Sequence, residues 1–301
     1  MKYTFSVDAV NDVLRAWSEE ESTAPRREFL GLSGIGDPCV RRLWYDYRWA
    51  TERKISNNLQ RIFDRGHLEE ERVIRDLKSI GILVFALNPP GSEAAKYAPE
   101  RELFGTAGEE QEEVLGHFPH VKSKIDGRCK NVPGGGDKDH LLEIKTMNQN
   151  SFNKLIKDGV EKSHPKYYAQ VQIYMDVTKL ERCLFVAVNK NNEAMHAERV
   201  KRDPAVAERL REVQRDVIFS RVPPPKLTTS SGALSWECKF CPHIKVCANS
   251  FPIGKSCRAC VYCDAVEADG EKIWCSLVDV LAPRDFAEQK EGCEHYEPLC
   301  Q

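Results

Sequence analysis

The sequence has no long hydrophobic run and no large excess of charge of either sign. Its longest apolar stretch, Ile82 to Leu87, is far shorter than the roughly 20 residues that a membrane-spanning helix needs. Asp8 and Asp12 interrupt the N-terminus where a secretory signal is continuously apolar, so we expect an intracellular protein. The 44 Lys and Arg residues nearly balance the 46 Asp and Glu residues, which excludes a globally basic nucleic-acid coat.

Cysteine, in contrast, is abundant and unevenly placed. Nine of the 12 cysteines lie between Cys238 and the C-terminus. Clustered C-x2-C pairs in an intracellular chain are typical of metal thiolates, because reducing compartments keep thiols free of disulfides. Charge is uneven too: residues 254–301 hold 5 basic and 10 acidic residues, which leaves 39 basic and 36 acidic residues in the rest. We therefore expect nucleic acid to bind the body of the protein and not its tail.

The order of predicted elements divides the chain into four parts. Apolar residues recur with helical periodicity over residues 1–80, which predicts an N-terminal helical region. This region contains one cysteine, Cys39. Residues 81–220 alternate short strands with helices and form the expected core of the fold. Prolines and a Ser/Thr/Gly stretch open a linker and cysteine segment, 221–253, and residues 254–301 form a small tail. This order predicts an α/β fold, with a mixed α+β sheet flanked by helices.

Two strands of the expected core carry acidic residues that core packing does not require. Asp126 follows Ile125 in one stretch, and Glu143 and Lys145 flank Ile144 in another. Residues two apart on a strand share a face, so Glu143 and Lys145 should point together while Ile144 points away. A glycine-rich loop separates the two stretches and can fold one strand beside the other, which would bring Asp126 next to Glu143.

Neighbouring carboxylates of this kind predict a divalent-metal site. They repel each other unless a cation joins them, and oxygen ligands favour Mg²⁺ or Mn²⁺. Such an ion polarises a phosphate and acidifies its bound water, while the Lys145 ammonium can orient that water. The pattern therefore predicts phosphodiester hydrolysis. The alternative for an isolated Glu-x-Lys is an exposed salt bridge, which is common and weak.

With Asp126, Glu143 and Lys145 on its three signature positions, the sequence resembles the PD-(D/E)XK nuclease superfamily and, more narrowly, its RecB-like branch. The resemblance implies a restriction-endonuclease-like core. That branch has a Gln-x-x-x-Tyr helix after the core, which Gln170 and Tyr174 match four residues apart on one helix face. The resemblance implies that these two side chains position the scissile strand.

The branch also has an upstream helix with Gly, three intervening residues and a metal-binding His. Here Gly66 is followed directly by His67, and Glu70 takes the fourth position after Gly66. Either Glu70 replaces the expected His as a metal ligand or His67 reaches the site, with Glu70 preferred. The alternative for the acidic run around Glu70 is a solvated helix face.

Four further cysteines match the iron–sulphur subgroup of RecB-like nucleases, which includes the AddB subunit and the CRISPR-adaptation nuclease. Cys238, Cys241 and Cys247 form C-x2-C-x5-C, and Cys39 precedes an N-terminal helix. In that subgroup one N-terminal and three C-terminal cysteines hold a [4Fe-4S] cluster, so the resemblance implies a structural clasp across the core. Zn²⁺ suits the same four thiolates and stays open as an alternative.

The tail carries a second set of thiols with a zinc-ribbon-like layout. Cys257 and Cys260 form one C-x2-C pair, and Cys275 and Cys293 follow at intervals. So short a segment needs a metal to fold, so we expect Zn²⁺ there. The fourth ligand stays open, because besides Cys293 the tail offers three other candidates, Cys263, His295 and Cys300.

The resemblance implies a metal-dependent deoxyribonuclease, an exonuclease on DNA ends or single strands in recombination, repair or phage DNA metabolism. The expected location is the cytoplasm of a bacterial or phage-infected cell. Two alternatives stay open: a DNA-binding scaffold without turnover, and an adaptor whose zinc tail recruits a replication or recombination protein.

Overall fold

The computed structural model describes residues 7–85, 111–249, 251–265, 273–277, 283–284 and 286–299. The helices are α1 (Val7–Glu19), α2 (Val40–Tyr47), α3 (Asn57–Ser79), α4 (Gln149–Ser163), α5 (Pro165–Thr178), α6 (Pro204–Phe219), α7 (Ile244–Asn249) and α8 (Phe286–Glu291). The strands are β1 (Glu21–Thr23), β2 (Leu30–Gly31), β3 (Lys54–Ser56), β4 (Leu83–Phe85), β5 (Glu113–Leu115), β6 (Val121–Lys124), β7 (Gly127–Lys130), β8 (His140–Met147), β9 (Arg182–Asn189), β10 (Met195–Lys201), β11 (Cys263–Ala265), β12 (Ile273–Cys275) and β13 (Pro283–Arg284). None of the described helices is long and apolar enough to cross a membrane.

A five-stranded mixed sheet, in the order β10-β9-β8-β7-β4, forms the centre of the fold. β7 runs antiparallel to β8, with Gly127 opposite Leu142, whereas β9 runs parallel to β8, with Phe185 opposite Glu143. Two parallel strands need a crossover connection, and α4 and α5 supply it. The mixed sheet and its helices confirm the α/β fold class predicted from the sequence.

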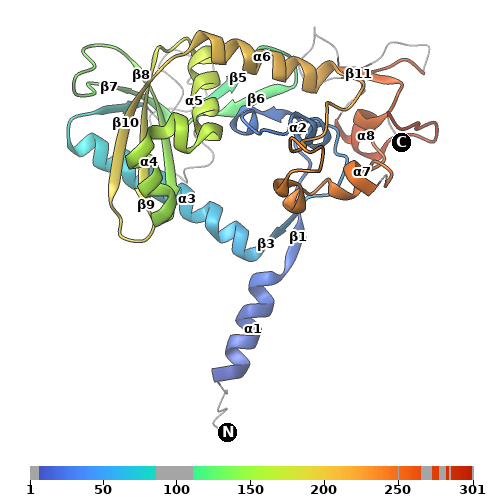
Figure 1. The fold of residues 1–301 in the computed structure, drawn as a ribbon, viewed down its shortest axis with the longest axis horizontal. Helices are drawn as coiled ribbons and strands as arrows, with labels where there is room; N and C mark the ends of the chain where they lie inside the picture. The colour runs from blue at the N-terminus through green and yellow to red at the C-terminus, as the bar shows by residue number, and fades with distance from the viewer. Residues whose placement is uncertain are drawn as a thin grey trace.

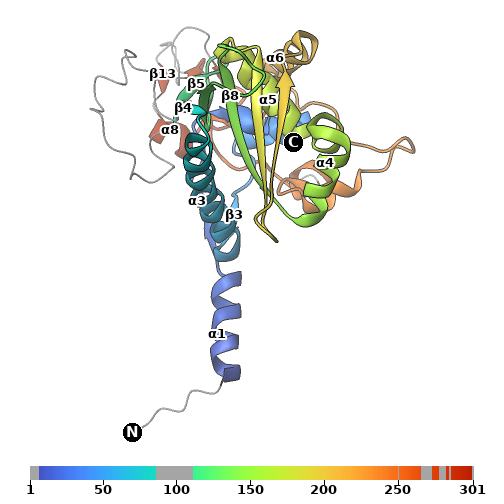
Figure 2. The ribbon, with the colours of Figure 1, turned by 90° about the vertical axis from the view of Figure 1, so that its left-hand side faces the viewer.

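Helices cover both faces of this sheet (Figures 1 and 2). On one face Leu141 and Phe185 pack with residues of α4, α5 and α6 in the larger apolar core. On the other face Leu142 and Ile144 pack against Val73 and its neighbours on α3. Because successive residues of a strand point to opposite faces, Glu143 lies on the α5 side of β8, as does Leu141.

The stretch from residue 121 to residue 130, expected as one strand, is divided between two sheets. β6 pairs with β5 and β2 in a separate three-stranded sheet, whereas β7 joins the central sheet. Ile125 and Asp126 lie between them, and Gly127 has a φ of 152°, which residues with a side chain rarely adopt. The chain therefore changes direction at Asp126, which places this carboxylate at the start of β7 and beside β8.

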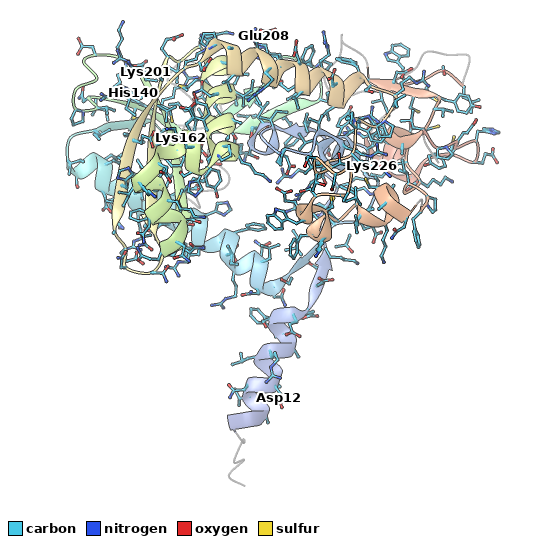
Figure 3. The ribbon with its side chains drawn as sticks, viewed as in Figure 1. Asp12, His140, Lys162, Lys201, Glu208 and Lys226 are labelled. Carbon is cyan, nitrogen blue, oxygen red and sulfur yellow. The ribbon has the colours of Figure 1, made fainter. Side chains whose placement is uncertain are left out.

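The N-terminal region is less helical than its periodicity predicts. β1 and β3 pair as an antiparallel ribbon, with Thr23 opposite Lys54, and β2 pairs with β6. Elements this short carry too few residues for a period to be recognised in the sequence. α1 stands away from the rest of the molecule, as the position of Asp12 in Figure 3 shows, so its predicted apolar face is largely exposed.

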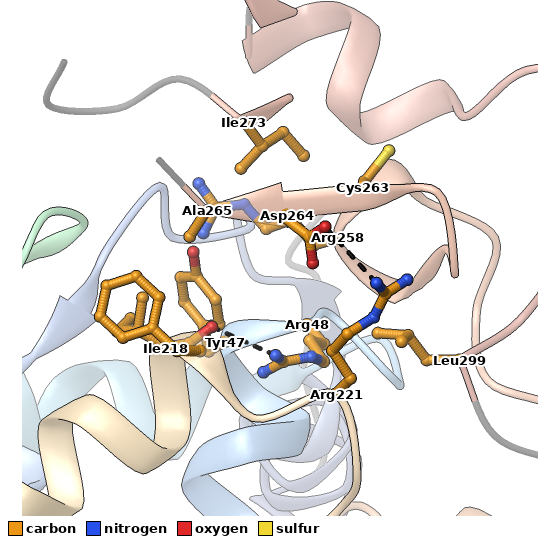
Figure 4. A pocket seen from close by; sticks show the side chains of 11 residues that line it. Tyr47, Arg48, Ile218, Arg221, Arg258, Cys263, Asp264, Ala265, Ile273 and Leu299 are labelled. Carbon is orange, nitrogen blue, oxygen red and sulfur yellow. Dashed lines mark hydrogen bonds and ion pairs between the residues drawn. The ribbon is translucent and has the colours of Figure 1, made fainter. Parts of the chain in front are cut away.

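The cysteine-rich tail packs against α2. The Arg258 guanidinium lies 4.8 Å from the ring centre of Tyr47 and 4.4 Å from that of Trp49, and it donates a hydrogen bond to the Glu28 carbonyl at 2.6 Å. Figure 4 shows Arg258, Tyr47 and Arg48 around a cavity of about 40 Å³ at this junction. Cation–π contacts of buried guanidinium groups each stabilise by about 2 kcal/mol. The tail is thereby fixed to the N-terminal region, far from it in sequence.

Candidate active site

The two carboxylates that were expected to be neighbours do lie side by side. Asp126 Oδ2 accepts a hydrogen bond from the Ile144 amide at 2.7 Å, which ties the carboxylate to β8. Asp126 is 9% exposed and Glu143 is fully buried. The charge of Asp126 also affects the titration of Glu143, as described below. The predicted approach of β7 to β8 is confirmed.

Glu143 has two different oxygen environments. Oε1 accepts a hydrogen bond from the Gln170 amide at 2.7 Å and pairs with the Lys145 ammonium, which lies on the same side of β8. Oε2 is buried and has no hydrogen-bond partner among the described residues. A buried carboxylate oxygen without a partner is costly unless it gains a proton or a cation. One oxygen of Glu143 is therefore held in place while the other remains available as a ligand.

α3 contributes the third carboxylate. Gln111, which the sequence motifs did not identify, donates from its amide to Glu70 at 3.1 Å and to Asp126 at 3.4 Å. Glu70 is half-buried, whereas His67 is exposed, and both line the cavity described below. The Gln111 amide thus joins Glu70 to the Asp126 side of the site. No motif precedes Gln111, so only the tertiary contact identifies it.

The neighbouring Glu69 has a structural role. It is buried and forms a 2.9 Å ion pair with Arg72. The acidic run is therefore not a uniformly solvated helix face, because its members differ in partner and burial.

The electrostatics of the site show that it is short of positive charge. Burial is the largest cause that raises the pKa of Glu143 to about 8, and Asp126 adds to the rise while Lys145 opposes it. Burial and the charge of Asp126 likewise raise the pKa of Glu70 to about 8. Burial raises the pKa of Asp126 as well. The carboxylates raise the pKa of Lys145 against the effect of burial, so its ammonium is firmly charged. A divalent cation would supply the missing charge.

Gln170 and Tyr174 lie on one face of α5, as predicted, but neither faces open solvent. Gln170 is 6% exposed and its amide is taken up by Glu143. Tyr174 is 1% exposed, and its hydroxyl shares a 2.7 Å hydrogen bond with Ser123 of β6. Burial, followed by the charge of Glu143, raises the pKa of Tyr174. The Gln170 amide therefore holds Glu143 in place, and Tyr174 holds α5 against β6.

A cavity of about 1020 Å³ opens beside the carboxylates. Glu70 and Lys145 line one part of it, together with Tyr167, whose ring lies 5.6 Å from the Lys145 ammonium. The remaining lining comes mainly from residues 23–55. Lys145 and Glu70 are therefore reached from a space large enough for a substrate chain, and Asp126 and Glu143 lie buried directly behind them.

The structure docks the C-x2-C-x5-C segment on α2, whose N-cap residue is Cys39. Burial, followed by other charges that include those of Cys238 and Cys247, raises the pKa of Cys39. Cys39 in turn contributes to the raised pKa of Cys241. The segment is held to α2 by the His243 ring, which lies 2.9 Å from Asp46. Cys39 and the C-x2-C-x5-C segment thus lie at the same helix, α2, although about 200 residues separate them.

The tail cysteines form a second group. Cys263 lies opposite Cys275 on paired strands, and its thiol donates hydrogen bonds to the sulphurs of Cys257 and Cys260, which raises its pKa. The hydrogen bond from Cys263 lowers the pKa of Cys260 to about 6. Cys293 lines the same small pocket.

The predicted ligand candidate His295 stands apart from this group. His295 is 66% exposed and lies beside Glu294, whereas Cys300 lies outside the described residues. Cys129 and Cys183 are fully buried on β7 and β9, as expected of core cysteines.

In the described ranges no group of three or more His, Cys, Asp or Glu side chains is arranged to hold a metal ion. The partnerless Glu143 Oε2 and the raised pKa values still fit a divalent cation, which oxygen ligands of this kind prefer. The two cysteine groups offer thiols in the free, unbridged form, the kind of ligand that thiophilic metals prefer.

Comparison with known proteins identifies the region around the carboxylates. Residues 101–181 match the YqaJ-like viral recombinase domain. The matched region contains five of the predicted site residues, namely Asp126, Glu143, Lys145, Gln170 and Tyr174. A comparison with curated proteins gives no match.

Solved structures show more distant likenesses. An alkaline exonuclease from Laribacter hongkongensis, LHK-Exo, is 18% identical, with a TM-score of 0.42 over 64% of this chain and 87% of that one. The LHK-Exo complex with dAMP is also 18% identical, with a TM-score of 0.41 over 67% of this chain and 90% of that one. The family match, which contains the clustered carboxylates, is the comparison that bears on the site.

Proposed function

We propose that the protein is a divalent-metal-dependent DNA exonuclease that acts in recombination or phage DNA metabolism. The observation that carries the proposal is the meeting of Asp126, Glu143 and Glu70 beside the Lys145 ammonium, with one oxygen of Glu143 buried and without a partner. The match of this region to a viral recombinase domain supports the same chemistry. A scaffold without turnover has no need to hold three acids with raised pKa values at one place.

In this proposal Asp126, Glu143 and Glu70 hold Mg²⁺ or Mn²⁺, with His67 as the alternative to Glu70. When bound, the ion supplies Lewis-acid polarisation of the phosphate and a more acidic water. Lys145 orients the attacking water and offsets the charge that develops on the phosphate. Its fixed charge suits this role, because the acids beside it keep the ammonium protonated.

Gln170 and Tyr174 act through other groups. The Gln170 amide fixes one oxygen of Glu143, so the second oxygen is presented in one direction. Tyr174 ties α5 to β6 through Ser123, next to the bend that carries Asp126. Support of this kind typically changes metal affinity or activity by 10- to 100-fold. We therefore propose them as positioning residues, in place of the direct strand contact that the resemblance implies.

We also propose that Cys39, Cys238, Cys241 and Cys247 hold a structural [4Fe-4S] cluster, with Zn²⁺ as the alternative, as in the RecB-like branch. The docking of the C-x2-C-x5-C segment on α2, which Cys39 caps, supports this assignment. The metal would clasp α2 to the segment that follows the core. Its contribution is to stability and to the wall of the cavity, since α2 lines that wall.

In the tail we propose a zinc site formed by Cys257, Cys260, Cys263 and Cys275. The hydrogen bonds among the first three thiols and the strand pairing of the last two support Cys263 as the fourth ligand. Cys293 lies at the edge of the same pocket. The packing of the tail on α2 favours an internal structural role over the recruitment of another protein.

The test of the proposed function is a cleavage assay with Mn²⁺ on linear and circular DNA, in single- and double-stranded form. The wild type should release nucleotides from linear DNA and leave circles intact. Asp126→Asn and Lys145→Ala should each lower the rate at least about a hundredfold. Lys130→Ala is the matched control, because Lys130 is an exposed residue of β7 paired with Asp139. Equal product from all four proteins would refute the assignment.

A further inference from the structure

Two arginines, Arg27 and Arg53, line the wall of the same large cavity. Each repels the other, and both line the cavity that contains Glu70 and Lys145. The Ala24 amide donates to the Arg53 carbonyl at 2.8 Å, so the two arginines lie on adjoining backbone at the end of the β1–β3 ribbon. Two guanidinium groups that line one cavity from adjoining backbone can both reach a single anion within it.

The nearby acid is already engaged elsewhere. Asp46 lies within electrostatic reach of Arg27, yet its carboxylate is 2.9 Å from the His243 ring and 3.9 Å from Arg42. Within the described residues neither Arg27 nor Arg53 forms an ion pair with a carboxylate. Loss of solvent, followed by the charge of Arg53, lowers the pKa of Arg27, which is what an unneutralised pair produces.

Hydrogen bonds fix the backbone that carries Arg27, which limits the positions that its guanidinium can take. The Arg27 carbonyl accepts a hydrogen bond from the Trp49 indole at 2.8 Å, and the next carbonyl, of Glu28, accepts one from Arg258 of the tail. Arg27 Nη1 lies only 3.1 Å from the position that a Cβ on Gly31 would take. The glycine therefore leaves room for the guanidinium to lie along the cavity wall.

We propose that Arg27 and Arg53 together bind one internal phosphate of the nucleic-acid strand whose neighbouring phosphate lies at the carboxylates. This inference rests on the proposed function for the identity of the strand. The shared cavity supplies the path, because Arg27 and Arg53 line it together with Lys145. A guanidinium pair suits a phosphodiester, whose two free oxygens can each accept from one arginine.

The experiment measures equilibrium binding of a fluorescein-labelled oligodeoxythymidylate by anisotropy, without Mg²⁺ or Mn²⁺, over a series of salt concentrations. The variants are Arg27→Gln, Arg53→Gln and the double variant. Arg209→Gln, an exposed residue of α6 that does not line the cavity, is the control. Arg27→Lys keeps the charge and removes the two-pronged contact. Thermal midpoints of all variants verify folding.

The double variant should bind about tenfold more weakly, and the slope of log K against log salt should fall by about 0.7, the value for one phosphate on a single strand. Arg27→Lys should weaken binding while it retains the slope, and Arg209→Gln should match the wild type. A double variant that is folded and binds within twofold of the wild type, with an unchanged slope, would overturn the inference.

The bound phosphate could be an internal phosphate of the strand or its 5′-terminal phosphate. Two oligonucleotides, one with a 5′-phosphate and one with a 5′-hydroxyl, distinguish these sources. Equal losses on both support an internal phosphate, whereas a loss confined to the 5′-phosphorylated strand refutes it. Because the assay contains no catalytic metal, its outcome is independent of cleavage. Binding through this pair in a protein that never cleaves DNA would support the inference and refute only the proposed function.

Discussion

The raised pKa values of the carboxylates lead to a quantitative prediction for metal binding. Glu143 and Glu70 have pKa values of about 8, against an ordinary value of 4.5 for each. A carboxyl with this pKa is about nine-tenths protonated at pH 7, so an incoming cation must displace its proton. Mn²⁺ binding should therefore release about one proton per titrating carboxyl at pH 7 and about half a proton at pH 8.

The affinity for Mn²⁺ should depend on pH, because the cation competes with these protons for the carboxylates. Between pH 6 and pH 7 the dissociation constant for Mn²⁺ should fall about tenfold if one carboxyl titrates and about a hundredfold if both do. Isothermal titration calorimetry in two buffers of different ionisation enthalpy measures the protons released. Glu70→Gln removes one titrating group and should lower the release by about one proton at pH 7. Binding without proton release, at an affinity independent of pH, would refute the reasoning.

Metal affinity is expected to rise with pH, whereas the stability of the metal-free protein is expected to fall as pH rises. A carboxyl whose pKa is raised on folding binds its proton more tightly in the native state, so its contribution to stability is present at low pH. That contribution is lost as pH rises from about 4.5 towards about 8 for Glu143 and Glu70. The thermal midpoint without metal should therefore fall over this range, and added Mn²⁺ should restore it most strongly at the alkaline end.

Three further predictions concern the supporting residues. Gln170→Leu removes the amide that fixes Glu143 and should lower kcat about 10- to 100-fold in a steady-state assay, with KM nearly unchanged. Cys39→Ala should remove the bound iron or zinc of the clasp, as metal analysis measures, whereas Cys129→Ala, at a buried thiol outside both groups, should retain it. Arg258→Gln should lower the free energy of unfolding by about 2 kcal/mol or more in denaturant titrations, because it removes contacts to Tyr47 and the N-terminal segment. An unchanged midpoint would show that the tail does not stabilise that segment.

The core of the site could be predicted because local rules define it. The two-residue period of a strand places Glu143 and Lys145 together, and the glycine-rich loop before β8 allows the return that brings Asp126 alongside. The helical period places Gln170 and Tyr174 on one face of α5. Each of these relations depends on residues close in sequence or on adjacent strands.

The rest could not be predicted because it depends on contacts between distant segments. Gln111 belongs to no motif, and its role follows only from its position between α3 and Asp126. Spacing alone could not choose among the tail thiols, whereas the pairing of β11 with β12 brings Cys263 to Cys275. The docking of the tail on α2 could not be predicted either, because no local pattern links Arg258 to Tyr47, about 200 positions earlier.

The most direct test of the account is the anomalous scattering of Mn²⁺ in crystals of the protein grown near pH 8, where the acids release their protons. We expect a peak bonded to the carboxylates of Asp126 and Glu143, with Glu70 or His67 completing its ligands. Crystals that contain Mn²⁺ elsewhere on the protein but none between residues 126 and 143 would contradict the assignment of a nuclease site.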